Sequence, residues 1–161
     1  MQNRMRCTVK TMSTLSRREA REAVLGLLFE TEFRADESSK EIFAVSVEDR
    51  EIPADDYVEK AYFAIAEHRE EIDAMIGNHA KGWKTSRLSK LSRSVLRLAV
   101  YEMLYEKEIP YSVSINEAVE LTKKYDDEKA RPFVNGVLNS IKNELEGNGK
   151  EAVDPATEEN Q

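Results

Sequence analysis

Residues 91–104 are apolar on nearly every side of a helix, and this segment limits the folds that the chain can adopt. Its apolar positions are Leu91, Val95, Leu96, Leu98, Ala99, Val100, Met103 and Leu104. A helix with so little polar surface is stable in water only when other elements cover most of it. We therefore expect a central, largely buried helix with the rest of the chain packed around it.

The segments on either side show the apolar spacing of amphipathic helices, at i, i+3, i+4 and i+7. The first stripe consists of Ala20, Ala23, Val24, Leu27, Leu28 and Thr31. The second follows Pro53 and consists of Val58, Ala61, Tyr62, Ile65, Ile72, Met75 and Ile76. The last consists of Phe133, Val134, Val137, Leu138, Ile141 and Leu145. Residues 42–45 predict a short helix, and no segment alternates as a strand does. The sequence predicts an all-α bundle of about six or seven helices.

Two Ser-x-x-Glu sequences predict helix starts. Ser16 to Glu19 and Ser114 to Glu117 both fit a capping box, in which the two side chains bond to backbone N–H groups. Pro110 ends the central helix, and Pro132 is expected in the first turn of a last helix that begins near Lys129. The domain division expected is a flexible extension over residues 1–15, a helical domain over 16–145 and a disordered acidic tail over 146–161.

Composition excludes several classes of protein. The chain has 161 residues, no apolar run long enough to span a membrane and no secretory signal. Its single Cys7 fits a reducing cytoplasm. His68 and His79 have no partners at ligand spacing, and no catalytic motif is present. We expect a cytoplasmic protein that is not an enzyme and has no cofactor, no metal site and no membrane contact.

Charge is unevenly distributed along this acidic chain. The net charge is −7, yet residues 1–35 are net +3, residues 36–80 net −9 and residues 81–111 net +4. Arg17, Arg18 and Arg21 occupy a helix start, where the helix dipole favours acids. A nearby phosphate would offset that cost, because helix N-termini and arginine forks both bind phosphate. The alternative is a solvated helix face in which Glu22 pairs with Arg18. The second basic zone contains Lys81, Lys84, Arg87, Lys90 and Arg93.

Phe29 and Phe33 give the first helix a second apolar face, because they lie four residues apart and off its main stripe. A helix with two apolar faces is either deeply buried or presents one face to a partner. Trp83 lies outside this helix, and either a stacked base or a helix junction would accommodate it.

Four segments together resemble the NusB family of bacterial transcription antitermination factors. Residues 16–30, SRREAREAVLGLLFE, resemble the arginine-rich first helix of the family, and residues 96–104, LRLAVYEML, resemble its central helix. The strongest match is residues 109–121, IPYSVSINEAVEL, followed by residues 133–138, FVNGVL. The resemblance covers residues 16 to about 145.

The resemblance implies two three-helix subdomains, no catalysis, and joint binding of single-stranded boxA RNA with ribosomal protein NusE in the RNA polymerase antitermination complex. By position, the RNA-binding residues are Arg17, Arg18, Arg21, Lys129 and Arg131. The NusE-contacting residues are, by the same correspondence, Phe29, Ser92, Lys129 and Phe133. Lys129 and Ser92 stand where some members carry an acid, which makes this surface more positive.

Two other functions fit the same residues. One is a NusB-like bundle that binds proteins but no RNA, and the other is the helical domain of an RNA methyltransferase. The free chain is either a monomer or a homodimer, because some NusB-like proteins self-associate through the same basic surface.

Overall fold

The structure is a computed structural model that describes residues 14–81 and 88–147. These residues form seven helices and no strand. The helices are α2 (Arg17–Thr31), α3 (Ser39–Asp49), α4 (Asp56–Glu67), α5 (Arg69–His79), α6 (Lys90–Tyr105), α7 (Tyr111–Tyr125) and α8 (Ala130–Gly147). The all-α prediction is confirmed. No helix within the described ranges is long and apolar enough to cross a membrane.

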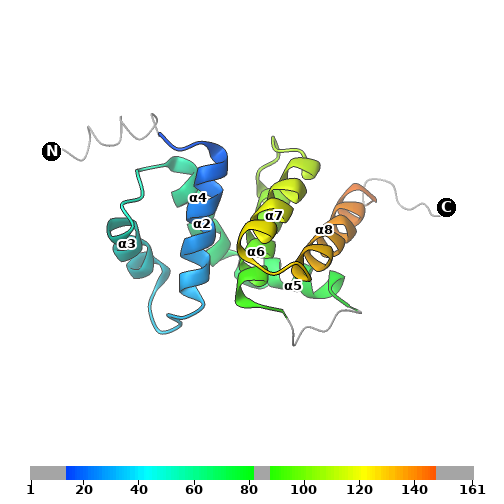
Figure 1. Ribbon diagram of the computed structural model, residues 1–161, viewed down its shortest axis with the longest axis horizontal. Coiled ribbons are helices and arrows are strands. Elements are labelled where there is room, and N and C mark those ends of the chain that lie inside the picture. Colours follow the sequence, from blue (N-terminus) through cyan, green and yellow to red (C-terminus); the bar gives the residue numbers. More distant parts are fainter. Residues whose placement is uncertain (1–13, 82–87, 148–161) are drawn as a thin grey trace.

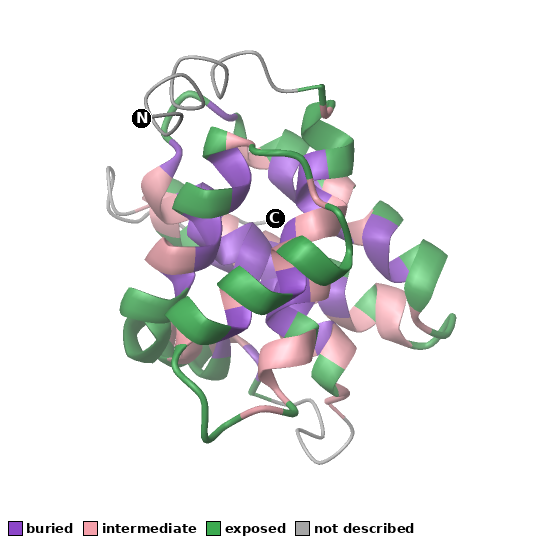
Figure 2. Cartoon of the chain, turned by 90° about the vertical axis from the view of Figure 1, so that its left-hand side faces the viewer, coloured by how far each residue is buried: buried purple, intermediate pink, exposed green. Residues whose placement is uncertain are grey.

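Helix α6 is the centre of the molecule, as its composition predicts. Every residue from 95 to 103 is buried, including the charged Arg97 and Glu102. Helices α2, α3 and α4 lie on one side of α6, and α5, α7 and α8 lie on the other (Figure 1). The purple residues of Figure 2 form an interior that is covered by the exposed turns of the surrounding helices.

The second apolar stripe is divided between two helices. His68 ends α4 and begins α5, with φ −103° and ψ 24°. Helix α4 packs against α2 and α6, whereas α5 packs against α6 and α8. The chain turns at His68, so that the first half of the stripe packs against α2 and the second half against α8.

One of the two predicted capping boxes is present and the other is wrong. Ser16 and Glu19 cap α2 reciprocally, as predicted. Helix α7, however, begins at Tyr111, directly after Pro110, so Ser114 lies inside the helix and not at its start. Pro110 has a fixed φ that suits the residue before a helix, so the helix begins directly after it. The Ser114 hydroxyl donates to Glu102 instead of capping the helix. A further capping box, Ser38 with Glu41, begins α3.

The last helix agrees with its prediction at the start and extends slightly further at the end. Helix α8 begins at Ala130, with Pro132 in its first turn, and continues to Gly147, two residues into the expected tail. The remaining expectations for the two ends of the chain, and those for Cys7, Trp83, Lys84 and Arg87, lie outside the described residues.

Candidate nucleic-acid interface

The start of α2 presents two arginines at the surface. The Ser16 side chain accepts a hydrogen bond from the backbone N–H of Glu19 at 3.0 Å, and Glu19 accepts one from the N–H of Ser16 at 2.9 Å. This reciprocal cap fixes the first turn of the helix. Arg17 and Arg18 follow the cap directly, and both are exposed. Their guanidinium groups therefore carry positive charge at an end of the helix that is itself electropositive.

Arg18 reaches across to α7 and pairs with Glu117. Its Nε donates to Oε1 at 3.0 Å and its Nη2 donates to Oε2 at 2.7 Å. The two parallel bonds form a bidentate fork, which is the strongest arrangement available to an arginine and a carboxylate. The hydrogen bond from Arg18 holds the pKa of Glu117 below its ordinary value. Glu22 does not pair with Arg18, because it binds Lys124 of α7 at 2.6 Å.

Arg21, the third arginine of the predicted set, is buried. Only 6% of it is exposed, and it donates to Glu102 of α6 from Nε at 2.7 Å and from Nη2 at 3.2 Å. Burial lowers the pKa of Arg21, but the hydrogen bond and charge of Glu102 outweigh it, so the pKa is raised. The structure therefore gives Arg21 an internal role, because α2 packs against α6 at this turn.

The Glu102 carboxylate accepts hydrogen bonds from side chains of three neighbouring helices. Besides Arg21 of α2, it accepts from the Tyr57 hydroxyl of α4 and from the Ser114 hydroxyl of α7, the latter at 2.7 Å. The guanidinium of Arg17 lies 4.3 Å from the centre of the Tyr57 ring, a cation–π contact. The arginines at the start of α2 are thus held by Tyr57, Glu102 and Glu117, none of which was predicted as a site residue.

Only a weak sequence signal points to these residues. Glu102 is the one acid among residues 91–104, a segment that the sequence predicts to be largely buried, which indicates a buried ion pair. Its partners cannot be identified from the sequence, because they are 12, 45 and 81 positions away and belong to separate helices.

The other end of α2 carries an aromatic patch, formed by Phe29, Phe33 and Lys90. Phe29 is 36% exposed and Phe33 is 62% exposed, so the second apolar face of α2 is not buried within the described residues. The two rings meet edge to face at 5.1 Å between centres, and the Lys90 ammonium lies 5.6 Å from the centre of the Phe33 ring. Lys90 is the first residue of α6, so the patch spans the end of α2 and the start of α6.

Ser92 lies one turn along α6 and is buried, with 3% exposed. Its hydroxyl donates to Asp126 at 2.8 Å, and the Ser89 hydroxyl donates to the same oxygen at 3.0 Å. These bonds tie the start of α6 to the residue that ends α7. The structure gives Ser92 an internal role, because its hydroxyl is directed to Asp126 and not to the surface.

The remaining predicted residues surround the start of α8. Lys129 is exposed, and its backbone N–H donates to the Asp127 side chain at 3.0 Å. Arg131 is half-buried, and Phe133 packs against the core. Lys129 and Arg131 follow Asp126 closely in sequence, and Asp126 accepts hydrogen bonds from Ser89 and Ser92 at the start of α6.

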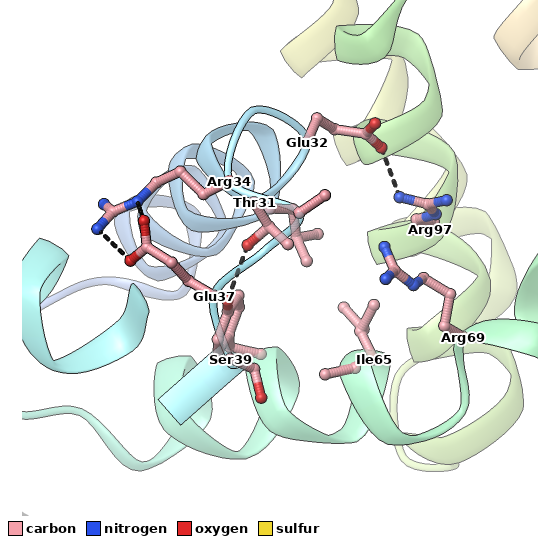
Figure 3. Close-up of a pocket in the computed structure, with 12 residues that line it drawn as sticks. Thr31, Glu32, Arg34, Glu37, Ser39, Ile65, Arg69 and Arg97 are labelled. Carbon is pink, nitrogen blue, oxygen red and sulfur yellow. Dashed lines mark hydrogen bonds and ion pairs between the residues drawn. The ribbon is translucent and has the colours of Figure 1, made fainter. Parts of the chain in front are cut away.

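A pocket of about 300 Å³ opens where the end of α2 meets α4, α5 and α6 (Figure 3). Two of its three arginines are held by carboxylates: Arg34 by Glu37 at 2.7 Å, and Arg97 by Glu32 at 2.6 Å. None of the predicted site residues lines it. The pocket is therefore a separate feature from the arginine surface.

Comparison with known proteins shows similarity to one family over most of the chain. The NusB family model matches residues 18–143. The transcription antitermination protein NusB of Bacillus pumilus is 42% identical over 131 residues, which are 81% of this chain and 98% of the relative. A solved structure of T. maritima NusB has 38% identity and a TM-score of 0.70, and the match covers 80% of this chain and 92% of that chain.

A second solved structure contains the antitermination factors NusB and NusE in complex with double-stranded RNA. It has 36% identity and a TM-score of 0.68, and the match covers 78% of this chain and 94% of that chain. The curated relatives are transcription antitermination proteins and not enzymes. With a family model that spans most of its length and relatives near 40% identity, this chain belongs to the NusB family of transcription antitermination proteins.

Proposed function

We propose that this protein binds boxA-type single-stranded RNA of ribosomal RNA transcripts together with ribosomal protein NusE, as part of the RNA polymerase antitermination complex. The observation that carries the proposal is the exposure of Arg17 and Arg18 in the first turn of α2. Sequence-specific RNA recognition usually targets single strands. Two guanidinium groups beside a helix N-terminus offer the charge and N–H donors that phosphates and base edges accept.

A NusE surface is supported by the aromatic patch and by the start of α8. Exposed aromatic side chains are typical anchors of protein interfaces, and Phe29 and Phe33 are the largest apolar side chains that α2 and its end expose. Lys129 is exposed and Arg131 is half-buried at the start of α8, and both carry positive charge. We assign Phe29 to NusE, Arg17 and Arg18 to RNA, and Lys129, Arg131 and Phe133 to the junction of the two.

Arg21 and Ser92 act indirectly in this proposal. Arg21 holds α2 against α6 through Glu102, and Ser92 holds the turn before α8 through Asp126. Both support the surface that their neighbours present.

The test compares an Arg17→Ala/Arg18→Ala double variant with an Arg69→Ala control. Arg69 is also exposed but begins α5, away from the start of α2. In the presence of NusE, the double variant is expected to bind boxA RNA more weakly and to flatten the slope of log K against log salt by about 1.4, or about 0.7 for each lost phosphate contact. The control should retain wild-type affinity and slope.

Two further measurements separate the alternatives. NusE binding without RNA should be unchanged in the double variant, which excludes a general loss of structure. The same RNA annealed to its complement should bind less tightly than the single strand. If the double variant binds RNA as wild type does, the chain is a protein-interaction bundle at this surface and the RNA assignment is wrong.

A further inference from the structure

The guanidinium group of Arg18 already forms a bidentate pair with a carboxylate of the protein itself. Its Nε and Nη2 both donate to the Glu117 carboxylate, at 3.0 and 2.7 Å. The Arg18 side chain is nevertheless 63% exposed, whereas that of Glu117 is only 17% exposed. An arginine placed to meet solvent and RNA thus directs one edge of its guanidinium inward, to a carboxylate of another helix.

Glu117 is held in place by its surroundings. It lies one turn beyond Ser114, whose hydroxyl is bound to the buried Glu102. The Nη1 of Arg21 lies 3.8 Å from Oε1 of Glu117, which adds a second positive charge beside it. A second ion pair, Lys124 to Glu22 at 2.6 Å, joins α7 to α2 one turn further along α2. The Glu117 carboxylate therefore lies between two arginines of α2, Arg18 and Arg21.

A carboxylate and a phosphate compete for the same arginine edge. Both accept two parallel N–H bonds from the guanidinium fork, so one occupant excludes the other at that edge. Glu117 also contributes a negative charge that repels an approaching phosphate whichever edge it uses. RNA binding must therefore either displace Glu117 from Arg18 or use only the N–H groups that remain.

We propose that Glu117 is an internal competitor for RNA phosphate at Arg18 and thereby sets the RNA affinity of the protein. This inference rests on the proposed RNA-binding function. It assigns to Glu117 a role in tuning that function beyond its ion pairs with α2.

The test is a Glu117→Gln variant with a Glu120→Gln control, both measured with NusE present. The glutamine side chain keeps the shape and one acceptor oxygen of the glutamate but removes its charge. Glu120 is an exposed acid on the same helix that acts on Arg18 only through space. E117Q is expected to bind boxA-type RNA about two- to fivefold more tightly, the range set by an exposed ion pair. Its salt slope should be steeper by about 0.7. E120Q should change neither quantity by as much.

A double variant identifies the route of the effect. If Glu117 acts by occupying Arg18, E117Q should have no effect on RNA affinity once Arg18→Ala is present. An equal gain in both backgrounds would show that only net charge matters and would overturn the proposal. Thermal unfolding should show that each variant is folded at the binding temperature.

The outcomes also separate this inference from the function on which it rests. If Arg18→Ala weakens RNA binding while E117Q does not strengthen it, RNA binding stands and the competitor role is wrong. If Arg17→Ala/Arg18→Ala has no effect on RNA binding, the proposed function itself fails at this surface.

Discussion

Glu102 is a single carboxylate whose hydrogen bonds join four helices. It lies on α6 and accepts from Arg21, Tyr57 and Ser114 of α2, α4 and α7. Only 1% of it is exposed. A buried charge is tolerated when its desolvation is offset by an opposite charge and by hydrogen bonds. Removing one partner leaves the other charged and unpaired, which costs more than the pair contributes.

Replacement of Arg21 by Ala is therefore expected to lower the free energy of unfolding by about 3–5 kcal/mol, the usual cost of breaking a buried pair. Arg18→Ala is the matched control, because it removes the same group from the same helix at an exposed position. Its unfolding midpoint should stay close to that of wild type. Urea unfolding followed by circular dichroism measures both. Equal stabilities would mean that Arg21 is not a structural residue.

Helix α2 has one face in the core and another at the surface. One buries Ala20, Val24, Leu27 and Leu28 in the core. The other leaves Phe29 at the surface, where its ring contacts that of Phe33 just beyond the helix end. Because Leu28 and Phe29 are adjacent in sequence, the rotation of about 100° between consecutive helix positions alone separates a core residue from a surface one.

Phe29→Ala should leave the melting temperature nearly unchanged and weaken NusE binding by about 2 kcal/mol or more, as the loss of an interface aromatic does. Leu28→Ala, one position earlier, should instead reduce stability by about 2–5 kcal/mol because it leaves a cavity in the core. Calorimetric melting and a NusE titration measure the two effects. A Phe29 variant that melts like the Leu28 variant would place Phe29 in the core.

Across the molecule, three tyrosine hydroxyls donate to carboxylates. Tyr57 of α4 donates to Glu102 of α6 and Tyr105 of α6 to Glu71 of α5, whereas Tyr101 donates to Glu106 at the end of its own helix. Burial and the charge of Glu102 raise the pKa of Tyr57, and burial with a hydrogen bond to Glu106 raises that of Tyr101. The hydrogen bond to Glu71 raises the pKa of Tyr105 to about 12. The folded protein therefore holds these phenolic protons at pH values where the unfolded chain releases them.

Stability should consequently fall as the pH rises above about 10, the ordinary tyrosine pKa. Each tyrosine with a raised pKa lowers the free energy of unfolding by about 1.4 kcal/mol per pH unit until the pH reaches its folded-state pKa. Urea unfolding between about pH 8 and about pH 11.5 spans the onset of this decline and measures it. Tyr101→Phe removes one of these protons, so its decline should be shallower by one tyrosine's share, whatever its stability at neutral pH. An unchanged slope would contradict the assignment.

The sequence alone determined the helical class, the central position of α6 and the starts of α2 and α8. These features depend on the 3.6-residue period of apolar side chains, on proline and on local capping, all of which act between residues close in sequence. It also indicated that Phe29 had two possible environments, without deciding between them. The arginines at the start of α2 could also be recognised from the sequence, because their charge opposes the helix dipole within a single turn.

Tertiary structure decided what each of those residues contacts. The Ser114 to Glu117 pattern fits a helix cap by local rules, but Ser114 binds Glu102 and Glu117 binds Arg18. The arginines Arg18 and Arg21 are three positions apart in sequence, and one is exposed while the other is buried. The division of the second stripe at His68 likewise followed from packing on two sides of α6. A local pattern cannot specify these outcomes, because each depends on groups that only the packed arrangement of several helices brings within hydrogen-bonding distance.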